Sequence, residues 1–316
     1  MMRKLWMIVL AIGLASPAGA CDLCAIWSSL QAKEMKPGPF VGLFEQYSEF
    51  GTLREDGHRI AAGGQHLYSS VTQAIVGYQF NQNFGVQVNV PSISRTFRRP
   101  EGGAMRSASV SGVGDVAALA KYLALVRVRG DGLLAWSVLG GVKLPTGNSD
   151  RIAEELMEHD GATGGLPPSG VHGHDITLGT GSTDVLVGST LFWRYRRGFV
   201  NASAQYALRR RGRFDYRLGD DFTWSVGPGV YVWLQHEGAL GVALEVSGEA
   251  KGEDDLKGET ARDTAIHAVY LGPALTFALG ESLYGELHAD FPLRQQNTGI
   301  QLVQDRRLRV AVSYRF

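Results

Sequence analysis

Two short stretches of this sequence carry residues that could bind a metal ion or form a covalent link. The first is Cys21-Asp22-Leu23-Cys24, which holds both cysteines of the 316-residue chain. In an exported protein such a pair can form a disulfide, exchange thiols or hold a soft metal ion such as copper. A c-type haem attachment needs histidine after the second cysteine, and Ala25 stands there instead. The three other interpretations stay open, with a plain disulfide first among them.

The second stretch is His172-Gly173-His174-Asp175, and His159-Asp160 precedes it in the same long loop. Two histidines beside a carboxylate can bind a divalent ion. The surrounding glycines and Pro167-Pro168 are typical of an exposed loop, so a solvated loop without metal is the alternative. The sequence predicts no resident cofactor, and the cysteine pair and this loop are its two candidate metal sites.

No stretch of the chain predicts catalysis. A nucleophilic hydrolase needs serine and histidine with a third, orienting group, and no Gly-x-Ser-x-Gly turn or distinguished Ser/His pair is present. Glycine motifs that bind nucleotides are absent as well. The sequence therefore predicts a protein that is not an enzyme.

The N-terminus has the order of a secretory signal. Arg3 and Lys4 precede an apolar run that ends near Ala15, and the small residues Ala18 and Ala20 precede a cleavage point. A helix that spans a bilayer needs about 20 apolar residues, more than this run contains. We assign residues 1–20 to a signal peptide and 21–38 to a periplasmic extension that carries the cysteine pair. A lipidation signal would need a bulky aliphatic residue where Ala18 stands.

The charge composition argues against binding of nucleic acid. Removing Arg3 and Lys4 from the 31 basic residues leaves 29 beside 31 acidic ones. A nucleic-acid-binding protein would show a basic excess. After the signal, no apolar run is long enough for a helix span, so a membrane location would require strands. The 41 glycines also suit a chain of strands and turns.

Twelve candidate strands follow one another, joined alternately by short turns and long loops. Short turns on one side and long loops on the other are typical of a bacterial outer-membrane barrel with both termini in the periplasm. We therefore predict an all-β fold, a closed antiparallel transmembrane barrel over residues 39–316 in the outer membrane of a Gram-negative bacterium. The strands are expected at 39–50, 66–80, 84–97, 114–126, 133–144, 184–196, 199–210, 222–234, 240–251, 264–279, 283–293 and at the C-terminal end, 308–316.

Apolar and polar residues alternate along these strands. Between 84 and 90, for example, Phe84, Val86 and Val88 alternate with Gln87 and Asn89. The apolar set would face lipid and the polar set a wet lumen. A β-sandwich would bury the apolar set instead, so the alternation alone does not separate the two folds. Aromatic residues near strand ends, where an interfacial girdle would lie, favour the barrel: Trp136, Trp193, Trp224, Tyr314 and Phe316.

Charged residues of both signs fall on the phase that would face the lumen. Such an interior can select solutes. Alternatively, cross-strand ion pairs can fill a narrow barrel of about twelve strands. The candidate lumen-lining residues are Asp115, Lys121, Lys143, Arg194, Glu245, Glu249, Glu286, His288, Asp290, Arg309 and Arg315.

Three glycine-rich segments and the C-terminal strand carry a family resemblance. The segments are Gly112-Val113-Gly114-Asp115-Val116 with Ala120-Lys121-Tyr122, Gly141-Val142-Lys143-Leu144-Pro145-Thr146-Gly147, and Leu178-Gly179-Thr180-Gly181-Ser182-Thr183-Asp184-Val185. With them the chain resembles the bacterial outer-membrane barrels named as transporters of the phenol meta-cleavage degradation pathway. The resemblance implies a barrel that interacts with outer-membrane lipid, and a terminal Phe316 that the barrel-insertion machinery recognises.

The favoured function is therefore a channel or transporter-like barrel for a small aromatic or hydrophobic solute. The alternative is a structural or metal-handling outer-membrane protein whose Cys21 and Cys24 capture a copper-type soft ion.

Overall fold

The computed structural model describes residues 36–156 and 168–316, and in them the chain forms a closed antiparallel barrel of twelve strands. The predicted signal peptide, both cysteines and His159-Asp160 lie outside the described residues. The wall strands are β1 Gly38–Glu55, β3 His66–Gln79, β4 Phe84–Glu101, β6 Ala117–Arg129, β7 Gly132–Lys143, β8 Asp184–Tyr195, β9 Gly198–Leu208, β11 Asp221–Gln235, β12 Gly238–Lys251, β15 Ile266–Leu279, β16 Leu283–Asn297 and β17 Ile300–Arg315.

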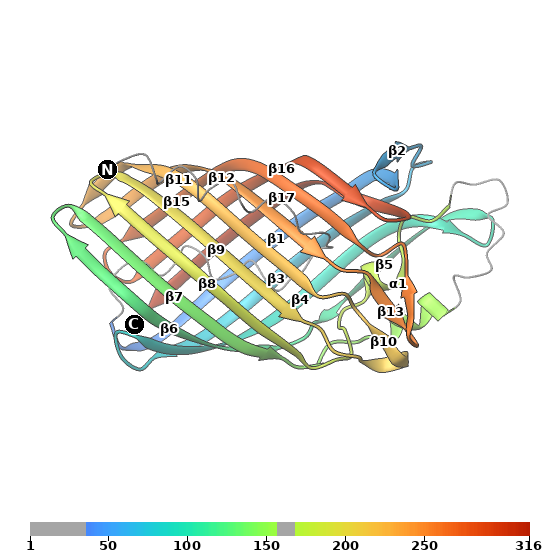
Figure 1. Ribbon diagram of the computed structural model, residues 1–316, viewed down its shortest axis with the longest axis horizontal. Helices are drawn as coiled ribbons and strands as arrows, with labels where there is room; N and C mark the ends of the chain where they lie inside the picture. The colour runs from blue at the N-terminus through green and yellow to red at the C-terminus, as the bar shows by residue number, and fades with distance from the viewer. Residues whose placement is uncertain (1–35, 157–167) are drawn as a thin grey trace, which may run out of the picture.

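Each wall strand pairs with its neighbours in the chain, and β17 pairs with β1 to close the sheet. That closing register runs from Phe40 opposite Arg315 to Glu55 opposite Ile300. Short turns lie together at one end of the barrel and the long connections at the other (Figure 1). In the orientation usual for bacterial barrels, the short turns face the periplasm.

The two faces of the wall have opposite chemistry. On β4, Val88 and Val90 are exposed outward, whereas Gln87 and Asn89 are buried. A soluble sandwich would show the reverse, with its apolar residues inside. Large apolar residues are exposed around the whole wall, so the barrel is built to stand in lipid, and its place is the outer membrane.

The band of apolar residues on the outside of the barrel ends before the strands do, on the side of the long loops. On β4 the outward residues beyond Val90 are Ser92, Ser94 and Thr96. The strand therefore continues past the membrane with a polar outer face. Among the described residues, no helix is both long and apolar enough to cross a membrane.

One predicted loop is a hairpin instead. A loop that contains Arg98, Arg99 and Pro100 is expected after residue 97, but β4 continues to Glu101 and turns into β5, Ala104–Val113. Gly102 and Gly103 form the turn with φ of 60° and 80°, the left-handed values that a two-residue hairpin turn requires. β5 pairs with β4 and with no other strand of the described chain.

Smaller elements gather at the end with the long loops (Figure 1). They are β2 His58–Ile60, η1 Asp150–Leu156, α1 Gly173–Ile176, η3 Arg213–Asp215, β10 Tyr216–Arg217, β13 Asp254–Leu256 and β14 Glu259–Ala261.

Residues 168–182, here called the inward segment, fold into the barrel mouth. Leu302 donates its backbone N–H to the carbonyl of Gly170 (2.8 Å), and the guanidinium of Arg95 on β4 donates to the carbonyl of Thr177. Its buried apolar residues pack on the inner wall in a cluster that contains Val171, Ile176, Leu53, Leu67, Phe97 and Leu302. Because burial of apolar side chains stabilises a packed segment, the inward segment is held in the mouth rather than in solvent.

Candidate functional site

Charged side chains of β12, β16 and β17 form a ladder across the inner wall. Arg309 donates to Glu245 (2.6 Å) and to both carboxylate oxygens of Asp290 (2.9 and 3.0 Å). Arg307 donates to Asp290 (2.8 Å) and to Glu249 (3.1 Å). All five residues are buried. Asp290 therefore bridges the two arginines.

Three further residues extend this charged ladder. The hydroxyl of Tyr270 on β15 donates to Glu249 (2.7 Å), and the Arg307 guanidinium lies 4.7 Å from the centre of the Tyr270 ring. The ring of His288 lies between Glu245 and Glu286, 3.4 Å from each carboxylate. The ladder thus has the cross-strand pairing that was the alternative to an open, charged bore.

Replacing Asp290 with Asn should lower the free energy of unfolding by about 1.5–3 kcal/mol, since two buried guanidinium groups lose a charged acceptor. Urea unfolding in detergent micelles measures it. Asp131→Asn is the matched control, because Asp131 pairs with Arg196 at the end with the short turns, where the two side chains are 64% and 71% exposed. An exposed pair contributes about 0–1 kcal/mol. Equal losses in the two variants would contradict the bridging role of Asp290.

The other predicted lumen residues lie apart from this ladder. Lys121 is buried on β6, while Arg194 on β8 and Arg315 on β17 are half-buried. Arg315 donates to the carbonyl of Lys36 (3.2 Å) at the end with the short turns. Sequence reasoning missed Arg307, which lies two residues before Arg309. Extending the alternation of the closing strand by one step would have found it.

The lumen also has an apolar wall, which sequence analysis did not predict. Phe40 and Phe44 of β1, Ile75 of β3, Leu119 of β6 and Leu186 of β8 are buried in one apolar cluster. Their neighbours along the strands, such as Val41 and Val76, are exposed on the outside. Both faces of these strands are apolar in places, so alternation could not assign the inner one. The lumen is therefore two-sided, with the charged ladder on β12, β16 and β17 and the apolar cluster on β1, β3 and β6–β8, where Lys121 of β6 is also buried.

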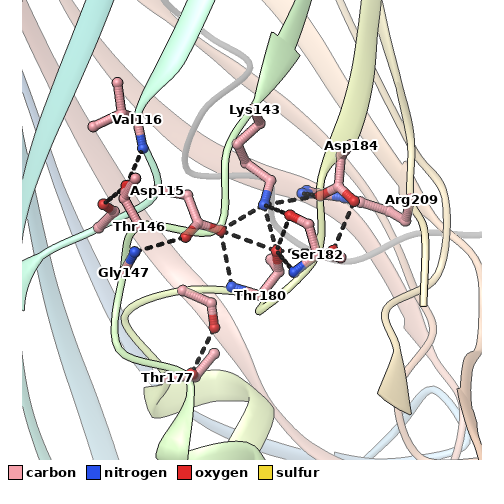
Figure 2. Close-up of polar contacts among 12 residues, drawn as sticks. Asp115, Val116, Lys143, Thr146, Gly147, Thr177, Thr180, Ser182, Asp184 and Arg209 are labelled. Carbon is pink, nitrogen blue, oxygen red and sulfur yellow. Dashed lines mark hydrogen bonds and ion pairs between the residues drawn. The ribbon is translucent and has the colours of Figure 1, made fainter. Parts of the chain in front are cut away.

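A second chain of ion pairs lies along the rim at the long-loop end (Figure 2). Lys143, fully buried at the end of β7, contacts Asp115 and Asp184, the latter at 2.9 Å. Arg209 continues the chain from Asp184 (3.0 Å) to Asp221 (3.4 Å). The sequence predicted only part of this rim network. Asp115 and Lys143 were expected in the lumen, whereas Asp184, Arg209 and Asp221 were not among the candidate residues.

The rim network also holds both ends of the long loop that follows β7. At its start, the backbone N–H of Gly147 donates to Asp115 (2.9 Å). At its end, the backbone N–H of Thr180 donates to the other oxygen of Asp115 (2.9 Å), and Ser182 donates to Asp184 (2.7 Å). Asp115 therefore closes the loop at its base, as Figure 2 shows.

The inward segment brings its two histidines and its carboxylate together. The rings of His172 and His174 are nearly parallel with centroids 5.5 Å apart, and Asp175 lies 3.7 Å from Nδ1 of His172 and 3.3 Å from Nε2 of His174. Burial would lower the pKa of His174, but the carboxylates of Asp175 and Glu155 outweigh it and hold that pKa well above its usual value. His172 and His174 are buried rather than solvated, which differs from the solvated loop that was one of the two expectations.

A cavity of about 100 Å³ separates the inward segment from the charged ladder. His174 and Asp175 line it from above, and Glu249, Lys251 and Gln304 line it from the wall. A second cavity, of about 460 Å³, lies beside the unpaired edge of β5. It is lined by Val110, Ser111, Gly112, Val113, Asn148, Asp150, Arg151, Glu154 and Leu178.

No family model matches the chain, and no curated protein matches it. Among solved structures, an outer membrane channel from Pseudomonas putida has a TM-score of 0.60 at 15% identity, covering 90% of this chain and 98% of that one. The beta domain of the Bordetella autotransporter BrkA has a TM-score of 0.47 at 11% identity, covering 89% and 100%. The CymD monoaromatic hydrocarbon channel has a TM-score of 0.35 at 8% identity, covering 89% of each chain. The first likeness agrees with the barrel fold; a role in phenol degradation stays a prediction.

Proposed function

We propose that this barrel lets a small hydrophobic or aromatic solute cross the outer membrane when the inward segment moves out of the mouth. The observation that carries the proposal is the two-sided lumen. A cluster of buried aromatic and aliphatic side chains spans β1, β3 and β6–β8, where a lumen used only for hydrophilic solutes would present polar groups throughout. An apolar solute gains contact there without desolvating the charged ladder on the opposite strands.

The entry point in this proposal is the cavity beside β5. Because no described strand pairs with the second edge of β5, side chains and loop residues line this cavity rather than a hydrogen-bonded neighbour strand. Val110, Val113 and Leu178 give that cavity an apolar part. Leu178 also packs against Val71 and Ile93 of the inner wall, so it connects the cavity with the barrel interior.

A reversible crosslink tests whether the inward segment must move. Cδ1 of Leu178 lies 3.0 Å from the position that a Cβ on Gly112 would occupy, so the sulfur atoms of Gly112→Cys and Leu178→Cys lie within reach of each other and should form a disulfide across the cavity. Cys21→Ser and Cys24→Ser remove the native thiols from the background. Oxidation should lower the influx of benzenesulfonate into proteoliposomes on the order of tenfold, because the segment can no longer leave the mouth, and reduction should restore it.

The two single-cysteine variants are the controls, and their influx should not respond to oxidation. Mass spectrometry reports the fraction crosslinked. A fully crosslinked barrel that conducts as fast as the reduced one would overturn the gating role of the segment. The metal-handling alternative depends on Cys21 and Cys24; influx that persists in the serine background would count against a role for these cysteines in transport.

A further inference from the structure

The inward segment carries a set of side chains whose arrangement is independent of solute transport. His172, His174 and Asp175 each offer a ligand atom, and these atoms lie within 4.8 Å of one another. Nε2 of His174 is 3.3 Å from one oxygen of Asp175, and Nδ1 of His172 is 3.7 Å from the other. Both histidines therefore turn one ring nitrogen toward the same carboxylate.

The second nitrogen of each ring faces a separate carboxylate. Nδ1 of His174 lies 3.0 Å from Glu155 in η1, and Nε2 of His172 lies 3.7 Å from Asp263, which precedes β15. Histidines that bind metal ions commonly have a carboxylate at the ring nitrogen that does not bind, because it fixes the ring orientation and raises the basicity of the ligand. Here His174 has that arrangement with Glu155, and Asp263 lies near the second nitrogen of His172 beyond hydrogen-bond distance.

One atom of the cluster lacks a hydrogen bond. His172 is buried, and its Nδ1 makes no hydrogen bond to any described residue. A buried ring nitrogen without a partner is unfavourable, and such groups in native proteins generally have a partner in ordered water or an ion. This nitrogen lies 3.7 Å from Oδ2 of Asp175, which also accepts the backbone N–H of His172 (2.9 Å), and an ion bound beside them would give the nitrogen a partner.

We propose that His172, His174 and Asp175 form a binding site for a divalent transition-metal ion. Two imidazoles and one carboxylate suit zinc, nickel, cobalt or copper(II), whereas calcium and magnesium prefer oxygen ligands throughout. Ligands about 2.0–2.1 Å from one ion are at most about 4 Å apart, so a small rotation of the rings from the present geometry closes the site. Three protein ligands leave further positions open toward the cavity that His174 and Asp175 line.

A bound ion would join elements that are distant in the chain. Through its ligands and their carboxylate partners it would connect α1 with Glu155 of η1 and with Asp263 beside β15. The ion would therefore hold the inward segment in the mouth. This inference goes beyond the proposed passage of a solute, since the site would bind metal whether or not the barrel conducts.

Calorimetric titration of the full chain with zinc or cobalt chloride, in detergent and in the Cys21→Ser, Cys24→Ser background, tests the site. One ion per chain is expected. His172→Ala, His174→Ala and Asp175→Asn should each abolish the binding or weaken it more than Glu155→Gln, which removes an orienting partner and should weaken it about tenfold. Cobalt should also give a visible absorption band that the histidine variants lose.

His236→Ala is the matched control, because His236 is exposed in the turn after β11, at the other end of the barrel. It should bind as the parent does. The shift in electrophoretic mobility on heating shows whether each variant is a folded barrel. Absence of binding in the folded parent, or equal binding in the His172→Ala, His174→Ala double variant, would overturn the proposal.

Discussion

Removing residues 148–178 and joining Gly147 to Gly179 is expected to raise the single-channel conductance of the barrel on the order of tenfold or more, since the inward segment is what fills the mouth. The two glycines already touch: a Cβ on Gly147 would lie 2.9 Å from the Cα of Gly179. The join therefore leaves Asp115, Lys143 and Thr180 in place. Planar-bilayer recordings of the deletion beside the full chain measure the change.

The deletion also uncovers inner-wall residues that the segment now covers, among them Leu53 and Phe97. Some loss of stability is expected, so heat-dependent electrophoretic mobility must first show that the shortened chain is a folded barrel. A folded deletion variant with the conductance of the parent would place the block below the mouth, at the charged ladder, and would contradict the gating role of the segment.

Replacing Lys143 with Met is expected to lower the free energy of unfolding by about 3–5 kcal/mol, the usual cost of removing one partner from a buried ion pair. Lys143 is fully buried between Asp115 and Asp184, so the substitution leaves two carboxylates with less compensation. Because Asp115 closes the base of the long loop, the same variant should also conduct more than the parent. Urea unfolding followed by tryptophan fluorescence measures the stability.

Two controls test whether the loss of stability in Lys143→Met comes from the buried charge of Lys143. Lys36→Met removes a lysine whose partner Glu281 is as exposed as Lys36 itself, and should cost about 0–1 kcal/mol. Adding Asp115→Asn to Lys143→Met should recover part of the loss, since Asp115 loses its ion-pair partner in Lys143→Met whereas Asp184 keeps Arg209. A double variant less stable than Lys143→Met would argue that packing, rather than charge, sets the effect.

The alternation of residues predicts the strands well where they cross lipid and poorly beyond it. The strand expected at 133–144 is found at Gly132–Lys143, but that expected at 283–293 continues to Asn297, and the closing strand begins at Ile300 rather than 308. Beyond the membrane the outer face of a strand becomes polar, as at Ser92 and Ser94 on β4, while the inner face is in part apolar, as at Phe97, so the period that marks a lipid-facing strand is lost. The β4–β5 hairpin was missed for the same reason, although Gly102-Gly103 is a turn signal.

The candidate sites divide along similar lines. The alternation of residues showed that members of the charged ladder face the lumen. Which of them pair depends on how neighbouring strands align, and a single sequence does not give that alignment. The contact of Arg307 with Asp290 and that of Lys143 with Asp184 both cross between strands. The histidine cluster was visible from its spacing alone, whereas Glu155 and Asp263 reach it from other segments of the fold.

The seam between β1 and β17 has a consequence for how the barrel assembles. Every other wall contact joins strands that are consecutive in the chain, so those pairs can form locally, one after another. The seam instead joins the two ends of the barrel sequence, and its loop-closure cost is the largest in the molecule. It should therefore form last. Until then β1 and β17 each present an open edge, and the outward pair of Glu49 with Arg306 is absent. Because β1 is synthesised first, its edge stays open longest. β1 is therefore the strand with the longest opportunity to pair with another chain before the barrel closes.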